Sequence, residues 1–158
     1  MNTVLGVDPG TAITGWGVVC GDDRRLQLVA YGTIRTPAHT PLPERLLTIY
    51  EHITAVLRRY QPDVMAVEKL FFRKNVTTAI AVSHARGVIL LAAAQARLLV
   101  EEFTPVEVKQ ATTGYGNADK RQVQEMVRRL LRLDVVPRPD DAADALAVAI
   151  CRLHTFRP

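Results

Sequence analysis

Cysteine and histidine are scarce in this sequence, and their scarcity narrows the chemistry that the protein can perform. The two cysteines, Cys20 and Cys151, lie in apolar surroundings without a CxxC partner, which predicts buried, reduced thiols and no disulfide framework. The four histidines show no HxxxH or other paired spacing, so we do not expect a zinc site. We also find no serine, cysteine or histidine with neighbours typical of a catalytic nucleophile.

Long apolar runs are lacking as well. Residues 76–100 come nearest to a membrane span, but Arg86 and Arg97 interrupt them, and a span needs about 20 predominantly apolar residues. The N-terminus has no basic, apolar and small-residue succession of the kind found in signal peptides. We therefore expect a cytoplasmic protein in which residues 1–158 form a single domain.

The hydrophobic pattern predicts an α/β fold. The expected strands cover residues 3–7, 15–20, 26–34, 64–67 and 98–103, and the expected helices cover residues 44–60, 76–97, 119–133 and 141–152. An early hairpin followed by alternating helices and strands predicts a mixed five-stranded sheet with helices on both faces. The helix over 76–97 is apolar on more than one side, so we expect one face to meet the sheet and another to meet a second subunit.

Acidic residues stand at the ends of three predicted core elements. Asp8 follows an apolar run and precedes the turn Pro9-Gly10, which we expect to lift it out of the sheet. Glu68 ends another apolar run, and Asp141 and Asp144 open the last helix three residues apart. Each acid alone has an ordinary explanation, as a turn former, a solvated side chain or a helix cap. Three such coincidences in one small domain favour a shared site for divalent cations.

Such a site would suit phosphodiester hydrolysis. Four neighbouring carboxylates repel one another, and two Mg²⁺ or Mn²⁺ ions would relieve that repulsion through oxygen ligands. Two ions about 3.5–4 Å apart can stabilise both the attacking and the leaving oxygen of a phosphodiester displacement. This chemistry requires no protein nucleophile, which agrees with the lack of a serine, cysteine or histidine in a setting typical of one.

The distribution of basic and aromatic residues favours a nucleic-acid partner. The net charge is +4, and the surface is more basic than this value if several acids gather in one site. Charge alone is equally compatible with an ordinary basic protein, and one of the two phenylalanines at 71 and 72 can belong to the core. The candidate DNA contacts are Phe71, Phe72, Arg73, Lys74, Asn75, Lys109, Tyr115, Lys120 and Arg121.

Five ordered segments resemble the motifs of the RuvC family of crossover junction endodeoxyribonucleases. The segments are residues 6–19 (GVDPGTAITGWGVV), 66–75 (AVEKLFFRKN), 84–88 (HARGV), 108–124 (VKQATTGYGNADKRQVQ) and 140–150 (DDAADALAVAI). The resemblance extends from Val4 to about His154. It implies a ribonuclease H-like fold, a homodimer, and Mg²⁺-dependent nicking of two like-polarity strands of a Holliday junction in recombination and repair, together with RuvA and RuvB.

The resemblance also implies roles for individual residues. The family's acidic quartet falls on Asp8, Glu68, Asp141 and Asp144, which would hold two Mg²⁺ ions per site, with Mn²⁺ as a substitute. Some relatives carry histidine at the position of Asp141, and Asp140 lies next to it as an additional acid. The family's base-wedging aromatic falls on Phe71, and its active-site lysines fall on Lys109 and Lys120.

Three other functions remain open from the sequence. The segment Asp8-Pro9-Gly10-Thr11 fits the first phosphate loop of the actin-like ATPases and sugar kinases, although a second lobe and a second phosphate loop are missing. A non-catalytic junction-binding module would use the acids as caps and turns. A related ribonuclease H-like nuclease would act on RNA precursors.

Overall fold

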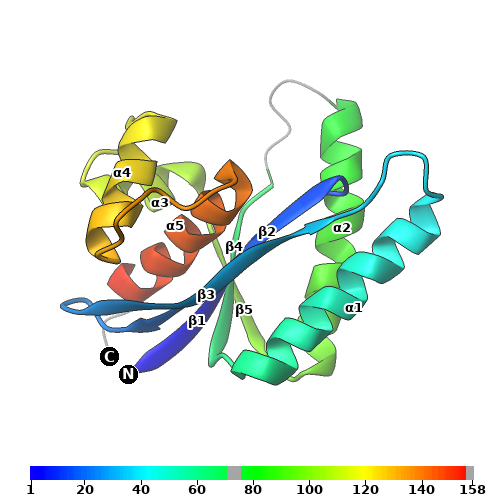
Figure 1. The fold of residues 1–158 in the computed structure, drawn as a ribbon, viewed down its shortest axis with the longest axis horizontal. Coiled ribbons are helices and arrows are strands. Elements are labelled where there is room, and N and C mark those ends of the chain that lie inside the picture. Colours follow the sequence, from blue (N-terminus) through cyan, green and yellow to red (C-terminus); the bar gives the residue numbers. More distant parts are fainter. Residues whose placement is uncertain (71–75, 156–158) are drawn as a thin grey trace.

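A five-stranded mixed sheet forms the centre of the computed structural model, which describes residues 1–70 and 76–155. Its strand order is β3-β2-β1-β4-β5 (Figure 1). The first three strands form an antiparallel meander, and the last two run parallel to β1. The strands are β1 (Asn2–Asp8), β2 (Ile13–Gly21), β3 (Leu26–Arg35), β4 (Val64–Glu68) and β5 (Leu99–Phe103). The predicted mixed sheet with an early hairpin is confirmed.

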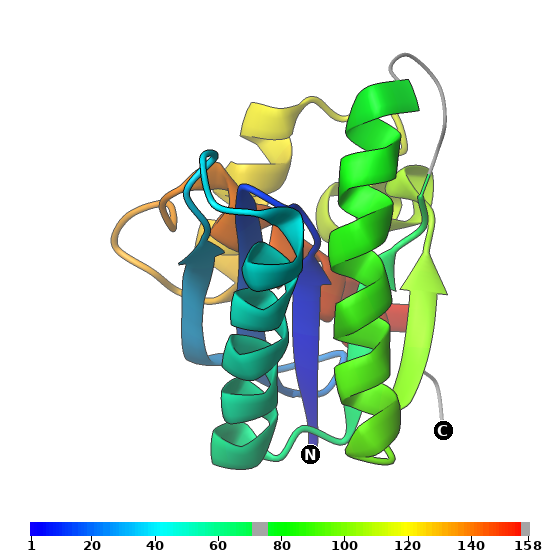
Figure 2. The same ribbon diagram turned by 90° about the vertical axis from the view of Figure 1, so that its right-hand side faces the viewer.

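Helices cover both faces of this sheet, as predicted. The helices α1 (Leu42–Tyr60) and α2 (Val76–Gln95) lie on one face, as Figure 2 shows, and pack on Leu5 and Val7 of β1. The other face carries α3 (Pro105–Thr113), α4 (Lys120–Leu130) and α5 (Asp140–Thr155). Successive side chains of a strand point to opposite faces, so the near-continuous apolar runs of β1 and β4 supply both cores.

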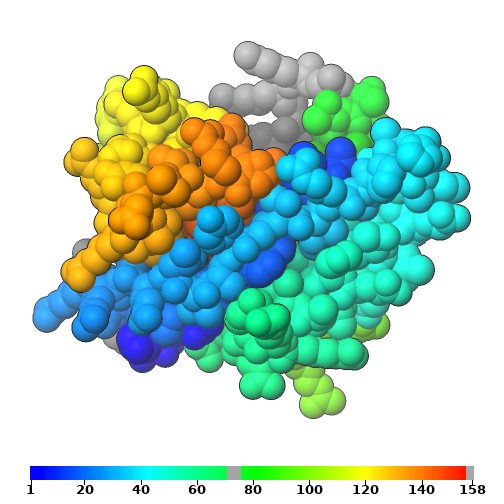
Figure 3. Space-filling view, in the orientation of Figure 1, coloured from blue at the N-terminus to red at the C-terminus, as the bar shows by residue number. Residues whose placement is uncertain are grey.

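The last helix, α5, lies unusually close to β1 and β2. A Cβ atom at Gly6 would stand 2.0 Å from the carbonyl oxygen of Ala145, and one at Gly15 would stand 1.9 Å from that of Asp141. Glycine is therefore required at both strand positions, because any side chain would collide with the helix backbone. This close approach brings the start of α5 to the end of β1. The segment of the chain between α4 and α5 lies at the surface between α4 and β3 (orange in Figure 3).

Several details differ from the prediction. The helix α3 was not predicted; it begins after Thr104, whose side chain and that of Glu107 form a capping box. Asp8 is not lifted out of the sheet by the turn, because it still pairs with Gly15 of β2. Both cysteines are free, but only Cys151 is buried, whereas Cys20 is half-buried.

The helix α2 is long and apolar enough to cross a membrane if only length and composition are considered. In the structure it packs against the sheet and α1 through small and apolar side chains, among them Ala85, Ile89 and Ala93. Its other side exposes Val76, Ile80 and Leu91. The expectation that one face of this helix meets the sheet is confirmed.

Candidate metal centre and nucleic-acid interface

Asp8 and Glu68 lie beside one another at the ends of two parallel neighbouring strands. The last paired residues of β1 and β4 are Val7 and Val67, so the two acids follow at the same level of the sheet. The alternation of side chains directs both acids to the face that α5 covers, since Val4 and Ala66 already contact the core on that side. The register of β1 and β4 therefore brings together two residues that are far apart in the sequence.

Asp141 and Asp144 complete the acidic cluster from the first turns of α5. Burial is the largest cause that raises the pKa of Asp8 to about 7, and the negative charges of Asp144, Asp141 and Glu68 contribute in that order. Burial and the charge of Asp144 also raise the pKa of Glu68. The four carboxyl groups are thus close enough to interact, as the prediction of a shared site requires.

Lys120, at the start of α4, supplies a positive charge to this cluster. Its Nζ atom lies 3.5 Å from Oδ2 of Asp144 and 3.5 Å from Oδ2 of Asp140. Although burial lowers the pKa of Lys120, attraction to these two carboxylates raises it overall. Asp140 is itself held by Arg138, whose Nη1 donates to its Oδ1 at 3.1 Å.

Lys109 reaches the same site from α3. Its charge lowers the pKa of Glu68 and so opposes the effect of burial on that acid. A cavity of about 260 Å³ is lined by Glu68, Lys109, Lys120 and Asp144. The two predicted lysines therefore flank Glu68 and Asp144, Lys109 from α3 and Lys120 from α4. Asp141 instead lines a neighbouring groove beside Thr11 and α2.

The chemistry of the donor groups fits a hard divalent cation. Carboxylate oxygens are the ligands that Mg²⁺ and Mn²⁺ prefer. Burial is the largest cause that raises the pKa values of Asp8, Glu68 and Asp144, and the charges of neighbouring acids raise them further. Within residues 1–70 and 76–155, no three acidic, histidine or cysteine side chains are already gathered into a ligand set. The four acids of the described chain therefore form an electronegative cluster and not a ready ligand set.

Besides Lys109 and Lys120, the predicted DNA contacts fall into two groups. Phe71, Phe72, Arg73, Lys74 and Asn75 lie outside the described residues. Tyr115 and Arg121 line a second cavity of about 420 Å³ between α3 and α4, next to the lysine side of the acidic site. The ring of Tyr115 is exposed and accessible to a ligand.

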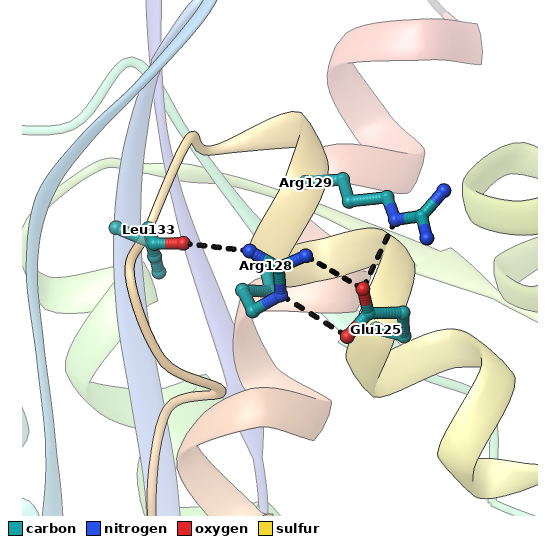
Figure 4. A network of polar contacts seen from close by, with 4 residues as sticks. All are labelled: Glu125, Arg128, Arg129 and Leu133. Atoms are coloured by element: carbon teal, nitrogen blue, oxygen red, sulfur yellow. Dashed lines mark hydrogen bonds and ion pairs between the residues drawn. The ribbon is translucent and has the colours of Figure 1, made fainter.

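An unpredicted network organises the basic side of α4. Glu125 accepts hydrogen bonds from Arg128 and Arg129, and Arg128 also donates to the carbonyl oxygen of Leu133 at 3.1 Å (Figure 4). The two arginines lower the pKa of Glu125 to about 2. The sequence signal for this network is the spacing of three and four residues between Glu125 and the two arginines, which places all three side chains on one face of the helix. A further residue that we did not predict is Arg86, which contacts the backbone of Glu68.

Comparison with known proteins identifies close relatives over nearly the whole chain. The sequence profile of the family described as "Crossover junction endodeoxyribonuclease RuvC" matches residues 4–152. Proteins of that name from Chloroflexus aggregans and Desulfitobacterium hafniense are 61% and 59% identical, each over 96% of this chain and 92% of their own length. The structure titled "T. thermophilus RuvC in complex with Holliday junction substrate" is similar with a TM-score of 0.92 and 38% identity, covering 96% of this chain and 92% of the other.

Proposed function

Because this chain belongs to the RuvC family of crossover junction endodeoxyribonucleases, we propose that it resolves four-way Holliday junctions in recombination and repair. It does so by paired, metal-dependent nicks in two DNA strands of like polarity. The observation that carries this proposal is the convergence of Asp8, Glu68, Asp141 and Asp144 at one end of the sheet, where Asp8 interacts electrostatically with the other three. The relative from T. thermophilus, whose structure contains a Holliday junction substrate, supports the choice of DNA.

Membership of this nuclease family implies dependence on a divalent metal. We propose two Mg²⁺ ions per site, held by Asp8, Glu68, Asp141 and Asp144, with Mn²⁺ as a substitute. When bound, the ions would activate water and stabilise charge on the phosphodiester oxygens. The four side chains would orient the ions against the scissile strand, and their shared burial would strengthen every electrostatic contact there.

The lysines have a complementary role in this proposal. Lys120 lies within ion-pair distance of Asp144, and Lys109 acts on Glu68, so both can stabilise negative charge that develops on the phosphate. Phe71 is the proposed wedge that opens or stacks on bases at the junction. The other proposed DNA contacts are Phe72, Arg73, Lys74, Asn75, Tyr115 and Arg121.

The assembly is also part of the proposal. A four-way junction presents two equivalent strands, and a twofold dimer presents two equivalent sites. The exposed apolar residues Val76, Ile80 and Leu91 of α2 make this helix our candidate for the dimer interface. We further propose that residues 1–158 act as one nuclease domain in the cytoplasm, together with RuvA and RuvB.

A substrate comparison tests this function most directly. The protein and its Asp8→Asn variant are each incubated with a four-way DNA junction, linear duplex DNA and an RNA hairpin, with Mg²⁺ or with EDTA. We expect symmetric nicks in the junction alone, dependent on metal, with Asp8→Asn still binding the junction but failing to cut it. Preferred cutting of the RNA hairpin would replace this proposal with an RNA nuclease, and binding without cutting at every metal concentration would reduce it to a junction-binding module.

Saturable ATP binding, measured by calorimetry, would instead support a phosphotransferase related to the actin-like ATPases. The described chain offers only the loop from Asp8 to Thr11 as a phosphate-binding loop of that kind. The side chain of Thr11 is committed elsewhere, because it donates to the carbonyl oxygen of Ala81 in α2 at 2.5 Å. We therefore expect no ATP binding.

A further inference from the structure

Arg86 is a charged residue on the buried side of the apolar helix α2. Its side chain is 11% exposed and lies against the ends of β4 and β5. One nitrogen, Nη1, donates to the backbone carbonyl oxygen of Glu68 at 2.7 Å, and the other, Nη2, pairs with the carboxylate of Glu102. A single guanidinium group therefore joins α2 to two neighbouring strands at the edge of the acidic site.

This contact fixes the backbone from which Glu68 extends. The carboxyl group of Glu68 is directed toward α5, whereas Arg86 binds its carbonyl oxygen from α2 on the opposite face of the sheet. On the β5 side, the amide of Lys69 donates to the carbonyl oxygen of Phe103 at 2.7 Å and extends the ladder by one residue. The peptide unit after Glu68 is thus held on both of its polar atoms.

We propose that Arg86 is a positioning residue for the metal site and acts through the backbone of Glu68. This inference rests on the proposed role of Glu68 as a metal ligand. In this role Arg86 is not itself a metal ligand; it restricts the peptide of Glu68 so that the carboxylate meets Asp8 and Asp144 in one arrangement. Outer partners of metal ligands act in this way, and their loss costs about 10–100-fold in metal affinity or activity.

The choice of arginine follows from its geometry. Its planar fork presents separate nitrogens to the carbonyl oxygen and to the carboxylate at the same time. A lysine has one nitrogen and can retain the charge and the pair with Glu102, but it cannot reproduce both contacts in the same geometry. Arg86→Lys is therefore an informative conservative variant, and Arg86→Gln removes the charge as well.

The chain supplies a matched control on the other face of the same strand. Glu101 is adjacent to Glu102 in β5, and its Oε2 lies 2.6 Å from Nε of Arg152 in α5. Each of the two glutamates thus joins a helix arginine to β5. Arg86, the partner of Glu102, also donates a hydrogen bond to the carbonyl oxygen of Glu68. Glu101→Gln weakens an equivalent ion pair and reports the effect of a general loss of packing between helix and sheet.

The experiment measures metal response in two independent ways. Junction cleavage under single-turnover conditions is titrated with Mn²⁺ and Mg²⁺, and the metal-dependent rise in melting temperature is recorded without DNA. For Arg86→Gln and Arg86→Lys we expect the metal concentration for half-maximal response to rise, or the rate at saturating metal to fall, by about 10–100-fold. For Glu101→Gln we expect both readouts to stay within about twofold of the parent protein, because Glu101 lies opposite Ala66 in the sheet and pairs with Arg152 of α5, not with the arginine that binds the peptide after Glu68.

The outcomes separate this inference from the proposed function. If Glu68→Gln abolishes cleavage but both Arg86 variants respond to metal like Glu101→Gln, the positioning role is wrong while the nuclease proposal stands. If Glu68→Gln leaves cleavage intact, the assignment of Glu68 fails and the inference fails with it. If Arg86→Gln does not fold, Arg86→Lys decides: an unchanged metal response refutes the inference, and a weakened one at unchanged metal-free stability supports it.

Discussion

Replacing Asp8 with asparagine should change how the stability of the metal-free protein depends on pH. Asparagine has nearly the same shape as aspartate, so the variant removes the ionisable group while leaving the end of β1 in place. Asp8 has a pKa of about 7 in the folded protein against 3.8 as its ordinary value, because of its burial and the acids around it. The folded state therefore holds this proton more tightly than the unfolded state does.

The sign and size of the effect follow from proton linkage. Between the two pKa values the folded protein binds more protons than the unfolded chain, so the free energy of unfolding falls as pH rises through this interval. Each pKa unit corresponds to about 1.4 kcal/mol, so the ionisation of Asp8 alone should lower the free energy of unfolding by about 2–3 kcal/mol between pH 5 and pH 8. For a chain of this length this corresponds to about 5–10 °C in melting temperature.

Urea denaturation at pH 5, 6, 7 and 8 in the presence of EDTA measures this difference. We expect Asp8→Asn to gain stability over the parent protein as pH rises, while the contributions of distant groups such as Asp22 largely cancel in the comparison. Adding Mn²⁺ at pH 8 should stabilise the parent protein more than the variant. Parallel stability curves for the two proteins between pH 5 and pH 8 would refute the view that Asp8 lies in a buried acidic cluster.

Three further changes test other parts of the structure. Gly6→Ala should lower the free energy of unfolding by about 1–3 kcal/mol or more, because its Cβ would stand 2.0 Å from the carbonyl oxygen of Ala145; unchanged urea denaturation would contradict the close packing of α5. Lys120→Met removes the cation 3.5 Å from Asp144 and should slow single-turnover cleavage by about 10²–10³-fold, with a smaller change in junction affinity measured by gel shift in EDTA. Phe71→Ala should reduce cleavage more than binding, at a cost of about 1–3 kcal/mol; a loss of stability without a catalytic defect would place the ring in the core.

Two of the four acidic residues could be predicted from the sequence because they end apolar runs. Asp8 and Glu68 each follow a run of four apolar residues and stand directly after a predicted strand. That the two strands are neighbours could not be derived from periodicity, since it depends on the pairing of Val4 with Val64 across 60 residues. The resemblance to a known family supplied what the pattern alone left open.

Other features escaped prediction for identifiable reasons. The helix α3 has little separation between apolar and polar faces. Its sequence signal, the capping box of Thr104 and Glu107, flanks Pro105, and a proline directly after a strand pattern is equally typical of a loop. The close approach of α5 depends on Gly6 and Gly15, whose role becomes visible only when a helix is placed over them. The contact of Arg86 could not be predicted from a pattern of side chains, because its partner is a backbone carbonyl oxygen, which every residue has.

The position of Glu68 explains why helices on both faces of the sheet contribute to one site. A strand residue presents its side chain to one face, while the peptide unit that follows it remains accessible to groups from the other. At Glu68 the side chain faces the acids of α5, and the carbonyl oxygen receives Arg86 from α2. A shift of one residue in the pairing of β4 would turn the carboxylate toward α2 and separate it from Asp8. The register between Val7 and Val67 is therefore the structural condition on which both the acidic cluster and its support from α2 depend.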